Sequence, residues 1–416
     1  MGRLGLSGCA AVCFLVLCLA EGCRPVSPPT SAAPAAPAAN TTSATASVVA
    51  NAARRATNPN PQARPAWAYV SGGKLLLGDG SGTAVVLSDS AVDASAAAAA
   101  VTADGGTLAW TVGTGEISVT DRTGKRLRGI ALSQKDDRWG GVQLVWSPLG
   151  DRLAYTDDGY LWVADAGGKR TKLTQGRGVT GFAWSPDGTA LAVGRRGDLD
   201  KDLGLWRISL TGGKAVRLAP PSGDVFAATA PVWSPDGRNI AFLRAWEGGT
   251  LCFASADGSK KRLNIAPAWF PISWLDGKTV MYEEGSPEES SAGIRRCSLT
   301  GKPQSVYDGE VCSYGYRDGK LGVLTPEKAA GSKGTVTQVR VRVYSDVGGK
   351  PKLVRSQAFD GSWGTLVMGG GGRLAVVTNA GYGTPGVMHI VDTSGSGPAE
   401  LTPLLQKVDA VVGWVQ

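Results

Sequence analysis

The sequence predicts an all-β fold, a β-propeller of four-stranded blades, with eight blades expected and seven as the alternative. A short motif recurs along the chain, in which an aromatic or apolar residue precedes a turn rich in Pro, Asp and Gly. Successive copies begin 38 to 52 residues apart, which is the length of one propeller blade. The two ends of the repeated region also match complementary parts of one repeat. The lead residues of the copies are Val101, Trp146, Trp184, Trp233, Trp274, Tyr316, Met368 and Trp414.

The clearest copies are Trp184–Gly188 and Trp233–Gly237, which both read Trp-Ser-Pro-Asp-Gly. Such a segment predicts a tight reversal between two strands, because Pro fixes φ, Asp hydrogen-bonds nearby amides and Gly accepts a positive φ. The aromatic ring is expected to pack against the next blade. Short apolar segments, for example 190–194 and 204–208, then follow as the second and third strands.

The two ends of the repeated region predict how the ring closes. Trp67–Asp79 aligns without gaps with Leu153–Asp165, so the region begins at a second strand. Val411–Gln416 matches a first strand. We expect these end segments to pair and complete one shared blade, which hides the edges of an open sheet. Seven full units and the shared one give eight blades.

The first 22 residues have the layout of a secretory signal. Arg3 precedes the apolar run 9–20, which is too short to span a bilayer comfortably. The run leads to Gly22-Cys23, which resembles the bacterial lipobox, although Glu21 stands where a small residue is usual. The resemblance implies removal of residues 1–22, lipidation of Cys23 and attachment to the extracytoplasmic face of the cell membrane. Ordinary cleavage nearby and a retained signal are the alternatives.

Residues 23–65 are dominated by Ala, Pro, Ser and Thr, which predicts a disordered tether. The propeller is expected over residues 66–416. Three cysteines fall in this region, an odd number without a Cys-x-x-Cys pair, so neither a closed disulfide set nor a thiol-ligated metal is predicted. They are Cys252, Cys297 and Cys312.

The repeated Trp-Ser-Pro-Asp-Gly turn and the Leu-Trp pair of a following strand resemble the TolB-type, WD-like propeller repeats of bacterial envelope proteins. The same repeats form the propellers of prolyl-oligopeptidase and dipeptidyl-peptidase relatives, in which catalysis belongs to a separate hydrolase domain. The resemblance covers residues 66–416. It implies an extracytoplasmic binding scaffold.

Composition argues against two classes of function. The net charge of +8 comes from basic residues scattered over hairpin ends, so no nucleic-acid surface is predicted. The chain contains one histidine, His389, which the pattern places in a third strand as a packed residue. A Ser-His-acid enzyme is therefore not expected, and no catalytic residue, metal or cofactor is predicted.

For the other candidate sites, a structural role explains the residues better than a binding or catalytic role. Asp198-Leu199-Asp200-Lys201-Asp202 alternates carboxylates as a calcium loop does, but the spacing of the later ligands does not fit. Glu283-Glu284 and Glu288-Glu289 could grip an amine, as a double Glu does in dipeptidyl-peptidase propellers, but a solvated loop is expected. Cys252 and Cys297 are expected on the same face of neighbouring blades, and therefore unbonded. Gly369–Gly372 is expected to be a loosened turn.

The expected function is that of a non-catalytic lipoprotein whose propeller binds an envelope protein or polysaccharide, as a monomer. Contact is expected through long loops such as Pro220–Ala230 or Glu327–Gly334. Two alternatives remain open. One is a hydrolase or lyase that acts on envelope peptides or sugars with loop carboxylates, and the other is a structural accessory subunit of a membrane complex.

Overall fold

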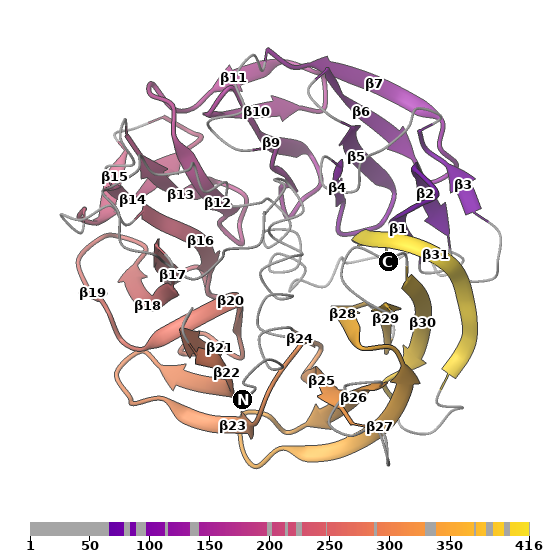
Figure 1. Ribbon diagram of the computed structural model, residues 1–416. Helices are drawn as coiled ribbons and strands as arrows, with labels where there is room; N and C mark the ends of the chain where they lie inside the picture. Colours follow the sequence, from indigo (N-terminus) through magenta and orange to yellow (C-terminus); the bar gives the residue numbers. More distant parts are fainter. Residues whose placement is uncertain are drawn as a thin grey trace, which may run out of the picture.

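The computed structural model shows strands arranged around a common centre (Figure 1). Every regular element in the described residues is a β-strand. No helix in these residues has the length and hydrophobicity needed to cross a membrane. The predicted signal, the tether and Cys23 lie outside the described residues. The described ranges are 66–78, 84–88, 97–112, 115–133, 141–197, 202–212, 215–221, 227–246, 248–286, 289–328, 338–369, 372–379, 386–394 and 400–415.

Four antiparallel sheets contain four strands each. Their strands are β4 (Ala97–Val101), β5 (Thr107–Val112), β6 (Glu116–Asp121) and β7 (Arg126–Ala131); β8 (Leu144–Trp146), β9 (Arg152–Asp157), β10 (Tyr160–Asp165) and β11 (Arg170–Lys172); β12 (Val179–Trp184), β13 (Ala190–Arg196), β14 (Asp202–Ser209) and β15 (Val216–Ala219); and β24 (Ser313–Arg317), β25 (Lys320–Glu327), β26 (Gln338–Ser345) and β27 (Lys352–Asp360).

Two longer sheets complete the arrangement. One contains β16 (Ala227–Trp233), β17 (Asn239–Trp246), β18 (Gly248–Ser255), β20 (Pro267–Trp274), β21 (Thr279–Ser286), β22 (Glu289–Ser298) and β23 (Gln304–Asp308), with β19 (Lys261–Arg262) paired to β18. The other runs in the order β28 (Trp363–Met368), β29 (Arg373–Asn379), β30 (Gly386–Asp392), β31 (Glu400–Val415), β1 (Ala66–Ser71), β2 (Lys74–Gly78) and β3 (Ala84–Val86).

The two end segments of the repeated region pair as predicted. β1 runs antiparallel to the last part of β31, with Ala66 opposite Val415 and Trp67 opposite Trp414. The earlier part of β31 pairs instead with β30, so one long strand belongs to two groups of strands. The predicted match of the β1–β2 hairpin with the β9–β10 hairpin is also confirmed, since both use two-residue turns with positive φ, Gly72-Gly73 and Asp158-Gly159.

The recurring turn has the predicted geometry. In the copy after β12, Gly188 has a φ of 71° and its amide donates to the carbonyl of Ser185. The Ser185 hydroxyl donates to Asp187, and the Thr189 amide donates to the same carboxylate at 3.0 Å. Burial acts to raise the pKa of Asp187, but these hydrogen bonds outweigh it and hold the pKa below its usual value.

The motif tryptophan reaches the preceding sheet rather than the next one, which corrects the sequence-based expectation. Trp184 Nε1 donates to the carbonyl of Val145 at 3.0 Å, and its ring packs in a cluster that includes residues of β9 and β10. The same bond from the indole to the preceding first strand recurs at three further positions, and for Trp274 that strand, β16, belongs to the same long sheet. They are Trp146 to Ala100, Trp233 to Ala183 and Trp274 to Val232.

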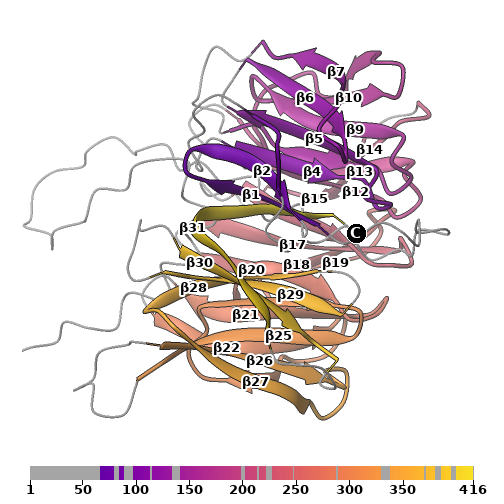
Figure 2. The ribbon, with the colours of Figure 1, turned by 90° about the vertical axis from the view of Figure 1, so that its right-hand side faces the viewer.

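Alternating strand direction gives the molecule two faces. The turns between first and second strands and the hairpins between third and fourth strands lie together on what we call the turn face. The hairpins between second and third strands and the connections to the next sheet lie on the opposite connection face. Figure 2 shows the ring edge-on, with successive sheets lying next to one another. The C-terminal end of β31 is marked C in this view. Ala66 pairs with Val415 at that end of β31, so the described chain begins on the turn face.

Candidate functional site

Charged side chains recur at one position near the connection face. In four successive groups of strands, the motif tryptophan pairs with a residue of the second strand. The residue four positions after that pairing partner is charged in each group. These residues end or nearly end the second strands β9, β13, β17 and β21. They are Asp157, Arg195, Arg244 and Glu284.

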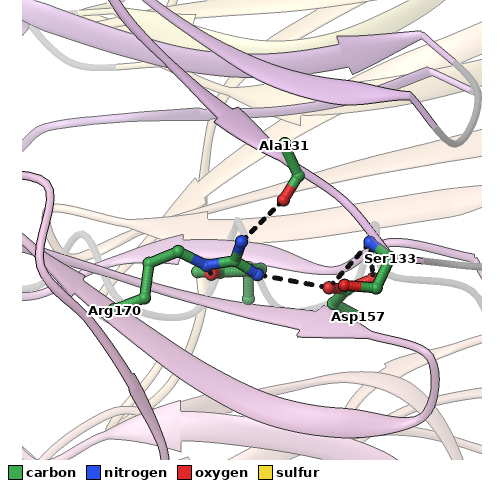
Figure 3. Close-up of polar contacts among 5 residues, drawn as sticks. Ala131, Ser133, Asp157 and Arg170 are labelled. Atoms are coloured by element: carbon green, nitrogen blue, oxygen red, sulfur yellow. Dashed lines mark hydrogen bonds and ion pairs between the residues drawn. The ribbon is translucent and has the colours of Figure 1, made fainter.

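Asp157 is the most deeply buried member of this set, at 1% exposure. Its carboxylate accepts the Ser133 amide at 2.8 and 3.0 Å and faces Arg170 Nη2 at 3.3 Å. Arg170 also donates to the Tyr155 hydroxyl at 2.7 Å. It donates to the Ala131 carbonyl at 2.8 Å as well (Figure 3). Because Ala131 and Ser133 belong to the end of β7 and the connection after it, this network joins two neighbouring sheets.

Two other members also bind groups that hold strands together. Arg244 is 8% exposed and donates Nη2 to the Pro220 carbonyl, at the end of the preceding sheet, at 2.7 Å. Glu284 accepts from Arg295 Nε at 2.6 Å, and Arg295 Nη1 lies 2.7 Å from Asp308 Oδ1. Arg195 is partly buried, and burial lowers the pKa of its guanidinium. Asp157, Arg244 and Glu284 therefore each hold strands or sheets together near the connection face.

The only histidine lies in β30, a third strand as predicted. Its ring centroid is 4.3 Å from that of Phe359, which belongs to β27 in the preceding sheet. Its Nε2 is 3.4 Å from the Thr378 hydroxyl. His389 thus takes part in packing between two sheets.

The predicted loop at Glu283-Glu284 is wrong. Both residues lie inside β21, where Glu283 is 2% exposed and Glu284 pairs with Arg295 across the strand. Glu289 opens β22 opposite Ser286, and Glu288 lies outside the described residues. An arginine on the neighbouring strand can stabilise a carboxylate within a strand. The local sequence around Glu283 and Glu284 does not reveal this partner.

The cysteines agree with the predicted structural role. Cys252 and Cys297 are free and buried, in the third strands β18 and β22. Cys312 is also buried. Burial raises the pKa of the Cys252 thiol, which disfavours the reactive thiolate.

Several other candidates fall partly or wholly outside the described residues. Asp198–Lys201 is not described, and Asp202 begins β14; in the described part of the chain no group of acidic, Cys or His side chains could hold a metal ion. Within the glycine run, the Gly369 amide donates to the Arg373 carbonyl at 2.9 Å and Gly372 has a φ of 73°, as a turn requires. Of the segments predicted as contact loops, 220–230 and 327–334, only residues 220–221, 227–230 and 327–328 are described. The prediction of a loop is wrong for residues 227–230, which lie in β16, and for Glu327, which ends β25.

An aromatic and basic cluster near β10 and β11 was not anticipated. Lys172 Nζ lies 3.8 Å from the Tyr160 ring centroid and 5.3 Å from that of Trp162. Arg170 lies 4.9 Å from the Trp162 ring. The sequence pattern that could have predicted this cluster is the alternation of Tyr160 and Trp162 along one strand. Arg170 and Lys172 alternate in the same way along the next strand. Only the strand register shows that Trp162 stands opposite Lys172.

Solved structures share this architecture at low sequence identity. The dihydro-heme d1 dehydrogenase NirN, in complex with DHE, aligns with a TM-score of 0.55 at 13% identity over 86% of this chain and 77% of its own. Dipeptidyl peptidase 4 from Porphyromonas gingivalis gives 0.54 at 11% identity over 83% and 59%. A prolyl endopeptidase gives 0.50 at 17% identity over 74% and 49%. The chain thus spans about half to three-fifths of these peptidases.

These likenesses support the β-propeller fold. At such identities they concern the fold alone. A putative TolB from Agrobacterium tumefaciens aligns with a TM-score of 0.37, too low to carry an argument. No protein-family model matches the sequence, and no curated protein matches it.

Proposed function

We propose that the chain is a non-catalytic, extracytoplasmic lipoprotein whose propeller binds and positions an envelope protein or polysaccharide. The observation that carries this proposal is the use of its charged and titratable groups in packing. His389 contacts Phe359 between two sheets, Glu284 binds Arg295, and Asp157 joins two sheets through Arg170 and Ser133. Rigid strands that carry connecting loops are a common platform for surface recognition.

The ring is proposed to contain eight blades. The four-stranded sheets account for four blades, and the eight-stranded arrangement for two more. The remaining seven-stranded sheet supplies two blades that share the long strand β31. In this arrangement the pairing of Ala66 with Val415 closes the ring and leaves no exposed strand edge there.

Attachment to the extracytoplasmic face of the membrane is proposed through a lipid on Cys23, with residues 24–65 as the tether and a monomeric ring. The test is metabolic labelling with a radioactive or clickable fatty acid in a bacterial host. The wild-type chain is expected to carry label, and Cys23→Ala is expected to lose it. Label that persists in Cys23→Ala would disprove lipidation at this residue.

The binding proposal is tested by crosslinking the native chain in its membrane and identifying what is captured. One dominant protein, reduced in amount with Cys23→Ala, supports an anchored scaffold and names its partner. Equal capture of many proteins by wild type and Cys23→Ala contradicts it. Glycan arrays probed with the same chain test the polysaccharide form of the proposal.

The alternative of a hydrolase or lyase draws on the fold shared with two peptidases, of which the matched regions cover 49% and 59%. It predicts cleavage of envelope peptides or sugars by the purified full chain, abolished by substitution of carboxylates at the β21–β22 hairpin, such as Glu289. The further alternative of an accessory subunit predicts stoichiometric co-purification with one membrane complex.

A further inference from the structure

Exposed lysines recur at the tips of the hairpins between third and fourth strands. Each lysine follows the turn directly, as Lys125 follows Gly124 and Lys169 follows Gly168. All are exposed. We call this set the lysine arc: Lys125, Lys169, Lys260, Lys302 and Lys350.

The topology brings the lysine arc to the rim of one face. These hairpins join third to fourth strands, and the fourth strands β7, β11, β19, β23 and β27 lie on the outside of the ring (Figure 1). All hairpins of this kind lie on the turn face. Five blades therefore present a lysine in the same direction, at the periphery of one face.

The acidic residues of three of these hairpins accept hydrogen bonds within their own turns, and Asp346 of another lies 3.0 Å from Lys352 Nζ. Asp121 accepts the amides of Thr123 and Lys125 at 2.8 and 3.1 Å, and Asp165 accepts the Lys169 amide at 2.9 Å. Asp257 accepts the Ser259 amide at 2.9 Å. Basic residues outnumber the acids in the sequence of each hairpin, although Arg126 pairs with Glu116 and Arg170 with Asp157. Each of the five described hairpins consequently has a net positive charge at neutral pH.

The chain also enters the ring on this face. Ala66 is the first residue of a second strand and pairs with Val415 at the turn face. The predicted tether, residues 24–65, joins the ring there. A flexible linker of that length spans roughly 35 Å, enough for the ring to contact the surface to which Cys23 is proposed to be anchored.

We propose that the turn face rests on a membrane of anionic phospholipids through the lysine arc, which leaves the connection face turned away from the membrane and open to a partner. The orientation rests on the proposed attachment at Cys23, whereas the lipid contact does not require it. A basic residue close to an anionic membrane strengthens binding about fivefold, which corresponds to about 1 kcal/mol. Such attraction weakens with salt, since the Debye length is about 8 Å at physiological ionic strength.

The test is sedimentation of the full chain carrying Cys23→Ala with vesicles of phosphatidylglycerol and phosphatidylcholine. Lys169→Gln/Lys260→Gln removes two lysines of the arc. Lys74→Gln/Lys328→Gln removes two exposed lysines at strand ends of the connection face and is the matched control for net charge. The arc pair is expected to lower vesicle partitioning at least tenfold and the control pair less than twofold. Lys169→Arg/Lys260→Arg is expected to restore binding, and vesicles of phosphatidylcholine alone to bind none of the proteins.

Equal losses in the arc and control pairs would show attraction by net charge and overturn the proposed orientation. Unchanged vesicle binding in the arc pair, with weakened retention on a soluble anionic polysaccharide, would overturn the lipid assignment. Because the vesicle assay uses Cys23→Ala, its failure is distinguishable from failure of lipidation, which fatty-acid labelling measures. Melting temperatures equal to that of the parent chain verify that each variant is folded.

Discussion

Removal of residues 411–416 tests whether the end strands hold the ring together. The deletion takes away the β31 partners of Ala66, Trp67, Ala68 and Tyr69. At about 1 kcal/mol per hydrogen bond, the lost pairing costs about 4 kcal/mol. Trp67 and Tyr69 are 0% and 1% exposed, and uncovering about 40 Å² of each adds about 2 kcal/mol at 25 cal/mol per Å². At about 2 °C per kcal/mol, the expected fall in melting temperature is on the order of 10 °C.

The assay is differential scanning calorimetry of the full chain and the truncated chain. The whole transition is expected to shift, because an open edge at β1 weakens contacts between the first and last groups of strands. A deletion of residues 58–63, of equal length and before the first strand, is the control and is expected to leave the transition in place. A truncated chain that melts within about 2 °C of the full chain would refute the closure argument.

Three further predictions concern the recurring turns and the contacts between sheets. Trp184→Phe is expected to lower the free energy of unfolding in urea by about 2 to 3 kcal/mol, because it removes a buried indole hydrogen bond and leaves a gap. Trp206 is partly exposed, so the control Trp206→Phe is expected to lower it by less than about 1 kcal/mol. Equal losses would contradict the role of the bond between sheets. A double-mutant cycle of Asp157→Asn and Arg170→Gln is expected to give a coupling of about 1 kcal/mol, and strict additivity would exclude the network. Because the pKa of Asp187 is lowered in the folded state, its carboxylate stabilises the fold above about pH 4, and this stabilisation is lost as pH falls through the folded-state pKa. Asp187→Asn is therefore expected to reduce the fall of melting temperature with acidity. A fall equal to that of the parent chain would refute this.

Local chemistry explains why much of the fold could be predicted. The Ser-Pro-Asp-Gly turns form because their own side chains and φ preferences determine the reversal, as Asp187 and Gly188 show. The gapless match between the first hairpin and the β9–β10 hairpin likewise rests on short-range turn requirements. Glu283 and Glu284 were misassigned because their place in a strand depends on Arg295, which lies on another strand.

By itself the sequence determined the repeat, the turn positions and the pairing of the two end segments, since each follows from the order of residues along the chain. Only the tertiary structure decided that Trp146, Trp184 and Trp233 bind the preceding sheet, because the direction in which successive sheets stack is not encoded within one repeat. Tertiary structure also decided which charges meet, as in Asp157 with Arg170, and that the hairpin lysines share one rim with the entry of the chain at Ala66. These relations join residues that are far apart in sequence, and they arise from strand register and from the alternation of strand direction.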